Sequence, residues 1–187
     1  MKDVMIDLET LGIKPGCSIL SIGAVAFDPE VGKLGEEFYL VVNRESCRSA
    51  GLEEGQSTID WWENQSLEAR EVLSHAEEGG LTLGEAISKL TEYLTQFGLG
   101  RVRVWGNGSD FDNAILAVCY DKLGEDVPWK FWNNRCYRTL KAINKGPRLK
   151  REGIYHNALD DAKSQAQHAL QLLSDNPIRP KFKPGCV

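Results

Sequence analysis

The order of apolar segments along this 187-residue chain predicts an α/β domain in which helices flank a mixed β-sheet. Three strand-like segments come first and are joined by short connections, which is typical of an antiparallel meander. Helical and strand-like patterns then alternate as helix, strand, helix, possible strand and helix, which favours parallel strands beside the meander. The length is that of one ordinary domain, so we expect a single domain over residues 1–175 and a tail over 176–187.

The expected strands are short apolar runs that end at turn-forming residues. Pro15 and Gly16 break the chain after the first run, and Asp28-Pro29 ends the second. The fourth run is closed by Gly106-Asn107-Gly108. The four strands are expected at residues 4–9, 19–27, 38–42 and 102–105.

The expected helices have apolar residues at helical spacing, most clearly over Thr82–Phe97. Ser66 and Asn157 each precede such a segment and are expected to cap it. The tail from Asn176 contains three prolines and no periodicity, so we expect no regular structure there. The six helices are expected at residues 59–64, 66–73, 82–97, 109–123, 138–144 and 157–174.

The composition is that of a soluble globular protein, with 42% hydrophobic and 26% charged residues. No apolar stretch approaches 18 residues and acids interrupt the first apolar run, so neither a membrane span nor a signal peptide is expected. The five cysteines are odd in number and form no C-x-x-C pair. This pattern favours reduced thiols in a cytoplasmic protein over a disulfide framework or a zinc–thiolate site.

The net charge of −5 argues mildly against a nucleic-acid partner, because proteins that bind phosphates are usually basic. The distribution of charge argues the other way, since Arg135–Arg151 carries seven basic residues and no acid. Such a run can guide a phosphate backbone electrostatically. The alternative is a solvated basic face without a ligand.

Two acids, Asp7 and Glu9, lie at the end of the first strand. Residues two apart on a strand project from the same face. Burying both carboxylates without partners would be strongly unfavourable, and a divalent cation such as Mg²⁺ or Mn²⁺ would remove that cost. The alternative is a strand end at which both acids are solvated.

A third acid, Asp112, follows the glycine turn where the fourth strand leads into a helix. Ligands of open α/β sheets bind at this kind of position. The alternative is structural, because Ser109 and Asp112 have the spacing of a capping box. Asp110, two residues earlier, would more naturally favour the helix dipole.

The last group surrounds the start of the final helix. With Asn157 as N-cap, His156 lies just outside the helix and Asp161 lies one turn inside it. The alternative makes Asp160 and Asp161 partners of the helix dipole and His156 a surface residue.

These three groups resemble, in order and local context, the motifs of the DEDDh group of 3′-to-5′ exonucleases, and the resemblance covers roughly residues 3–173. The group includes the proofreading subunit of DNA polymerase III, ribonuclease T and oligoribonuclease, and it implies a ribonuclease H-like fold. The motifs are Asp7-x-Glu9-Thr10, Asn107-x-x-x-Phe111-Asp112 and His156-x-Ala158-x-x-Asp161. The second has one residue more than usual between Asn and Phe, and Asp112 is preferred over Asp110 because it follows Phe111.

Two further segments, Thr58-Ile59-x-Trp61-Trp62 and Trp105–Gly108, resemble a branch of small phage and bacterial exonucleases that act on DNA or RNA. One tryptophan is expected in the core, and the other either joins it there or faces the substrate cleft.

The resemblance implies a site with two divalent cations, Mg²⁺ with Mn²⁺ as a substitute. Asp7 would bridge both ions, Glu9 and Asp161 would hold the ion that activates water, and Asp112 would support the other ion. His156 would take the proton from the attacking water, since its ordinary pKa of roughly 6.5 suits a base near neutrality.

The resemblance also implies contacts with a single-stranded 3′ end and the release of nucleoside 5′-monophosphates. Thr10 and the backbone near Leu8 would contact the 3′-hydroxyl, Leu11 would wedge beside the terminal base, and Phe111 would pack on it unless it serves the core. Asn107 and Arg138 complete the expected substrate-binding set. A homodimer is possible, as in many relatives.

Two alternative functions stay open on the sequence alone. One is a structure-selective endonuclease on the same fold, and the other is a non-catalytic nucleic-acid-binding module. The sequence does not distinguish DNA from RNA, because the two differ at one hydroxyl that a few local contacts recognise.

Overall fold

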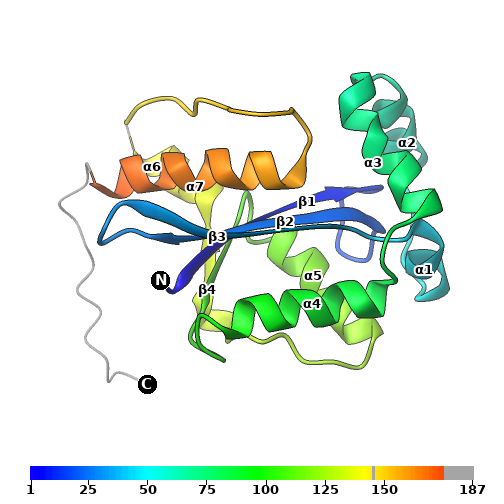
Figure 1. Ribbon diagram of the computed structural model, residues 1–187, viewed down its shortest axis with the longest axis horizontal. Helices are drawn as coiled ribbons and strands as arrows, with labels where there is room; N and C mark the ends of the chain where they lie inside the picture. The colour runs from blue at the N-terminus through cyan, green and yellow to red at the C-terminus, as the bar shows by residue number, and fades with distance from the viewer. Residues whose placement is uncertain (145, 175–187) are drawn as a thin grey trace.

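A five-stranded mixed sheet forms the centre of the protein, whose computed structural model describes residues 1–144 and 146–174 (Figure 1). The strand order is β3-β2-β1-β4-β5. The first three strands pair antiparallel, whereas β1 with β4 and β4 with β5 pair parallel, which confirms the expected sheet. The strands are β1 (Asp3–Thr10), β2 (Ile19–Asp28), β3 (Lys33–Val41), β4 (Arg103–Gly106) and β5 (Asn134–Cys136).

Helices cover both faces of this sheet and one of its ends. In Figure 1, α6 and α7 lie on one face, α4 and α5 lie on the opposite face, and α1 to α3 gather near one end. The helices are α1 (Arg44–Ser49), α2 (Gln56–Glu63), α3 (Leu67–Glu78), α4 (Leu83–Thr95), α5 (Asp112–Lys122), the 3₁₀ turn η1 (Phe131–Asn133), α6 (Tyr137–Ile143) and α7 (Ala158–Ser174).

The alternation of side chains along β1 decides which face carries the acids. Val4, Ile6 and Leu8 pack in the cluster that includes α4 and α5. Met5 packs instead with the alanines of α7. Because side chains alternate along a strand, Asp7 and Glu9 share the face of Met5 and point towards α7.

Local capping explains why several helices begin where the sequence predicts. Ser66 accepts a hydrogen bond from the Ala69 amide, and Asn157 accepts from the Leu159 and Asp160 amides. Thr82 forms a reciprocal capping box with Glu85. Each cap satisfies amides that a helix start leaves unpaired, and replacing such a cap typically costs about 1 kcal/mol.

Several elements differ from the expectation, among them α2, which begins at Gln56 rather than 59, and α3, which ends at Glu78 rather than 73. β3 begins at Lys33 rather than 38, because this edge strand is mostly exposed and its first residues lack an apolar run. Helix α1 was not expected, and its six residues are too few for a periodic pattern. Helix α5 begins at Asp112 rather than 109, with Phe111 at the N-cap position, so the capping-box reading of Asp112 is wrong.

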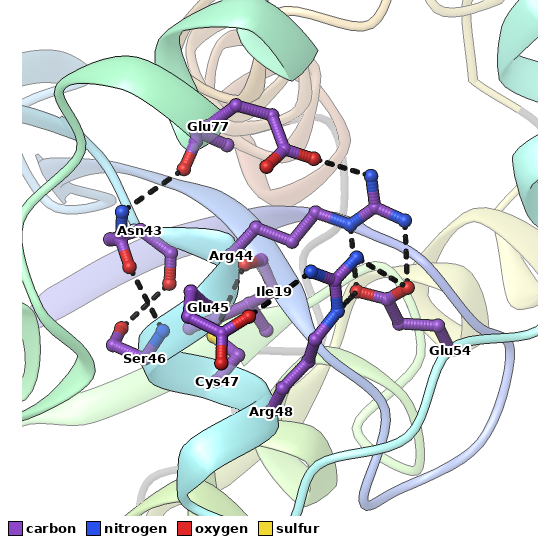
Figure 2. A network of polar contacts seen from close by, with 10 residues as sticks. Ile19, Asn43, Arg44, Glu45, Ser46, Cys47, Arg48, Glu54 and Glu77 are labelled. Atoms are coloured by element: carbon purple, nitrogen blue, oxygen red, sulfur yellow. Dashed lines mark hydrogen bonds and ion pairs between the residues drawn. The ribbon is translucent and has the colours of Figure 1, made fainter.

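An ion-pair network holds the segment before α2 against α1 and α3 (Figure 2). The Arg44 guanidinium donates to both carboxylate oxygens of Glu54, at 2.7 Å each, and to Glu77. Arg48 also donates to Glu54, and the Gly55 amide donates to the Leu11 carbonyl. The network therefore fixes the start of α2 beside the end of β1.

None of the helices within residues 1–144 and 146–174 is long and apolar enough to cross a membrane. The tail expected from residue 176 to 187 lies outside the described residues.

Candidate active site

Helix α7 packs closely against the sheet, which brings the His156–Asp161 motif next to the Asp7–Thr10 motif. Gly23 of β2 pairs with Asp7 in the sheet register. A Cβ atom at Gly23 would lie far inside van der Waals contact of the Ala158 carbonyl and the Leu159 amide. The glycine therefore lets the first turn of α7 pack directly on β2, beside the strand that carries Asp7 and Glu9.

Four acids gather at this point and disfavour one another's charge. Burial, followed by the charges of Asp112, Glu9 and Asp161, raises the pKa of Asp7 well above its usual value. Burial and the charges of Asp161 and Asp112 raise the pKa of Glu9 to about 8. Burial also raises the pKa of Asp112 to about 7 and that of Asp161 above its ordinary value. The negative charge of the acids thus exceeds the positive charge of the nearby arginines, which is the electrostatic condition that a cation site requires.

Backbone amides from two strand ends hold Asp112 within this cluster. The Leu8 amide donates to Asp112 Oδ1 at 3.3 Å, and the Asn107 amide donates to Oδ2 at 2.8 Å. Only 2% of Asp112 is exposed, whereas Asp110 is exposed on the surface. The structure therefore brings Asp112, not Asp110, to the other acids.

Gln165 is a member of the site that the sequence analysis missed. Its Nε2 donates to Asp7 Oδ1 at 2.7 Å, while its Oε1 is buried without a hydrogen-bond partner among residues 1–144 and 146–174. The amide thus orients Asp7 and leaves one acceptor free near the acids. The available signal was the spacing, since residue 165 lies one helical turn after Asp161.

His156 stands against the two tryptophans of α2. Its ring centroid lies 4.8 Å from that of Trp61 and 6.2 Å from that of Trp62, both in edge-to-face geometry. Its backbone φ of 63° is left-handed, which is uncommon for a residue other than glycine. Burial lowers the pKa of His156, so the ring is neutral at neutral pH.

The two tryptophans have different roles, a point that the sequence left open. Trp62 is only 1% exposed, packs in the core beside α3 and donates from its ring N–H to the Thr10 carbonyl at 2.9 Å. Trp61 is 43% exposed and lines the pocket over the acids.

A pocket of about 460 Å³ opens over the acid cluster. Its lining includes eight of the predicted site residues: Asp7, Leu8, Glu9, Thr10, Asn107, Phe111, His156 and Asp161. The lining also includes residues not predicted for the site, among them Trp61, Arg151 and Gln165.

Three predicted residues do not line this pocket. Asp112 lies beneath it and completes the acid cluster. Leu11 is 1% exposed and packs with Trp62 in the core. It is therefore too buried to contact the terminal nucleobase, and its expected role as a wedge is wrong. Arg138 lies beside Gly108, where its charge lowers the pKa of Asp112.

The donor set fits hard divalent cations. Ligand atoms of Glu9, His156 and Asp161 lie within 4.8 Å of one another, and Asp7 and Asp112 add carboxylate oxygens beside them. Carboxylate oxygens are the ligands that Mg²⁺ and Mn²⁺ prefer. The four acids could hold such ions, with His156 near enough to act either as a ligand or as a base.

The sequence matches a family model described as the 3′-5′ exoribonuclease Rv2179c-like domain over residues 2–173. It is also 30% identical to an exodeoxyribonuclease of Enterobacteria phage T4, with 74% of this chain and 70% of that protein covered.

Solved exonucleases share the fold. The nuclease domain of 3′hExo, a DEDDh family member bound to rAMP, superposes with a TM-score of 0.62 at 15% identity, covering 93% of this chain and 92% of that one. The zinc-bound complex of Escherichia coli exonuclease I with single-stranded DNA gives 0.65 at 15% identity, covering 94% of this chain and 41% of that one. These likenesses confirm the ribonuclease H-like fold.

These comparisons give no support to the homodimer considered above. The fold, the gathered acids and the match over nearly the whole described chain agree on one assignment. The chain belongs to the Rv2179c-like family of DEDDh 3′-5′ exonucleases and is an enzyme with 3′-5′ exonuclease activity on nucleic acid.

Proposed function

We propose that the enzyme removes single nucleotides from the 3′ end of single-stranded nucleic acid and releases nucleoside 5′-monophosphates with the help of two divalent cations. The observation that carries this proposal is the set of four acids at the base of one small pocket, with Asp7 half-buried and the other three buried. A volume of about 460 Å³ is within the range of small-ligand sites, roughly 300–1,000 Å³, so the pocket has room for a terminal nucleotide and not for a duplex.

Each polar residue in the pocket has a chemical task. Bound divalent cations, held by Asp7, Glu9, Asp112 and Asp161, would supply an activated water and neutralise charge on the phosphate. His156 is the base that accepts a proton from that water, because its lowered pKa keeps the ring neutral. Its contact with Trp61 limits how the ring can turn.

Thr10 can recognise the 3′ end of the nucleic-acid substrate. Its hydroxyl donates to the Gly12 carbonyl at 2.7 Å, so its oxygen lone pairs remain available to accept a hydrogen bond. A ribose or deoxyribose 3′-hydroxyl can donate that bond. An internal nucleotide, whose 3′-oxygen is esterified, lacks the donor.

Aromatic side chains at the rim support binding without base preference. Trp61 and Phe111 both line the pocket and are not fully buried. Stacking on an aromatic face tolerates any base and is worth about 1–3 kcal/mol per base. DNA and RNA strands are both candidate substrates, since the family model and the phage relative differ in the sugar that their names indicate.

Strands labelled at either end test the proposal. Single-stranded DNA and RNA carrying a 5′ label should give a ladder of shortening products with Mg²⁺ or Mn²⁺, and the same strands with a 3′ label should release labelled mononucleotide at once. EDTA should stop both reactions. Cleavage of a circular single strand would instead indicate an endonuclease and reject the proposal.

A pair of variants connects that activity to this site. Asp112→Asn should lower the rate at least about 100-fold, because it removes a buried charge from the cluster. Asp110→Asn is the matched control and should keep the wild-type rate. Equal losses in both variants would contradict the choice of Asp112.

A further inference from the structure

Arg151 occupies a position that the expected reaction does not explain. Its Nη1 donates to Asp161 Oδ1 at 3.0 Å and to Oδ2 at 3.4 Å, and its side chain is 32% exposed. It lines the pocket together with Glu9 and His156. A positive side chain is therefore bound to one of the acids expected to hold a cation.

The backbone on the C-terminal side of Arg151 is attached to α7, so this position is built by the fold. The Glu152 amide and carbonyl both bond the Ser164 hydroxyl, at 3.1 Å and 3.4 Å. The Ile154 amide donates to the Asp160 carboxylate at 2.8 Å. The Arg151 guanidinium also lies 4.8 Å from the centroid of the Tyr155 ring.

Arg151 is also the sole lysine or arginine in the lining of the pocket, as far as the described residues go. Without divalent cations it supplies a positive charge to a site rich in carboxylates. Divalent cations on Glu9 and Asp161 would repel the guanidinium and compete for the same oxygens. Once displaced, it would still be tethered at the rim by the bonds of residues 152 and 154.

We propose that the Arg151 guanidinium binds Asp161 in place of a metal ion when divalent cations are absent. When they bind, it leaves Asp161 and binds the phosphate at the 3′ end of the substrate. A guanidinium offers five N–H donors in a planar fork that matches phosphate oxygens. The cation–π contact with the ring of Tyr155 can stabilise the Arg151 side chain after it leaves Asp161. The inference rests on the proposed exonuclease function and adds a ligand for the phosphate.

Calorimetric titration of Mn²⁺ into the substrate-free protein tests the first half of this proposal. Arg151→Gln should tighten Mn²⁺ binding about fivefold or more, because the ion no longer competes with the guanidinium. Arg151→Lys retains a charge beside Asp161 and should bind Mn²⁺ nearly as the wild type does. Unchanged affinity in Arg151→Gln would overturn the proposal.

Steady-state kinetics at saturating Mg²⁺ test the second half. Arg151→Gln should raise KM for a single-stranded substrate about tenfold or more, since a charge-assisted hydrogen bond to the phosphate is lost. The tighter metal binding and weaker substrate binding should thus occur in the same variant. A KM equal to that of the wild type would overturn the proposal.

Arg148→Gln is the matched control, because Arg148 is an exposed arginine of the same segment that does not line the pocket. It should leave Mn²⁺ affinity unchanged and KM within about twofold. An inactive wild-type enzyme would reject the proposed function itself. An active wild type with an unaltered Arg151→Gln variant would reject only the assignment of Arg151.

Discussion

Asp7 lies beside three other acids and accepts one hydrogen bond from an amide. A neutral substitution at this position should therefore lower activity while raising stability. Asp7→Asn should reduce the rate at least about 100-fold, since a carboxylate proposed to hold the cations is lost. The metal-free protein should become more stable because the mutual repulsion of the acids falls. A gain of about 1 kcal/mol would raise Tm by about 2–4 °C in a domain of this size. A lower Tm would indicate that the carboxylate stabilises the fold instead.

His156 can act as a base or as a metal ligand, and one variant distinguishes these roles. His156→Ala should lower kcat about 10²- to 10⁴-fold, the usual contribution of a general base, while the Kd of Mn²⁺ measured without substrate stays unchanged. Since ligand atoms of Glu9, His156 and Asp161 lie within 4.8 Å of one another, a large loss of Mn²⁺ affinity would instead make His156 a ligand.

Gln165 orients Asp7 and is expected to affect metal binding without being a ligand. Gln165→Leu should weaken Mn²⁺ binding or kcat about 10- to 100-fold, as is usual for residues that orient metal ligands. Loss of the hydrogen bond should also raise the pKa of Asp7 further, because that bond favours its charged form. Gln167→Leu, on the exposed side of the same helix, is the control and should match the wild type.

At the scale of elements, the site depends on how closely α7 approaches β2. Gly23→Ala should destabilise the protein by about 2 kcal/mol or more and lower activity, since a Cβ there conflicts with the α7 backbone that leads to Asp161. A Cβ at Gly84 in α4 would meet nothing within 4 Å in the described part of the chain beyond its own helix backbone and chain neighbours, so Gly84→Ala should be neutral or stabilising. Chemical denaturation of both variants measures the difference. Equal stabilities would show that α7 can shift without cost.

The elements that the sequence predicts well are those with local signals for a helix. Helices α3, α4 and α7 carry side-chain caps and periodic apolar faces, and both signals are local. Strand β3 lacks such signals because it is an exposed edge. Helix α1 has a side-chain cap, Asn43, but its six residues are too few for a periodic apolar face, and ion pairs to Glu54 and Glu77 hold it.

At the scale of the whole molecule, the raised carboxylate pKa values couple stability to pH. The folded protein retains a proton on Glu9 up to about pH 8, whereas the unfolded chain loses it near pH 4.5. Stability without metal should therefore fall as pH rises between these values, by at most about 1.4 kcal/mol per pH unit for one such group. Thermal unfolding between pH 5 and 8 in EDTA measures this fall.

Divalent cations should reverse that dependence, because they bind the ionised acids of the folded state. Mg²⁺ or Mn²⁺ at pH 8 should raise Tm more than at pH 5. Glu9→Gln should flatten the pH dependence in EDTA. A Tm that rises with pH in the absence of metal would show that the acids are not mutually destabilised.

The sequence by itself determined the residues whose roles depend on near neighbours. Asp7 and Glu9 share a face because strands alternate, and Asn157 starts α7 because its side chain caps local amides. The tertiary structure decided what depends on contacts between distant segments. It selected Asp112 through the amides of Leu8 and Asn107, placed Gln165 on Asp7 across 158 positions of sequence, and buried Leu11 while exposing Trp61. Such contacts arise from packing between layers, and spacing along a helix gives which side chains share a face but not which strand residue they meet.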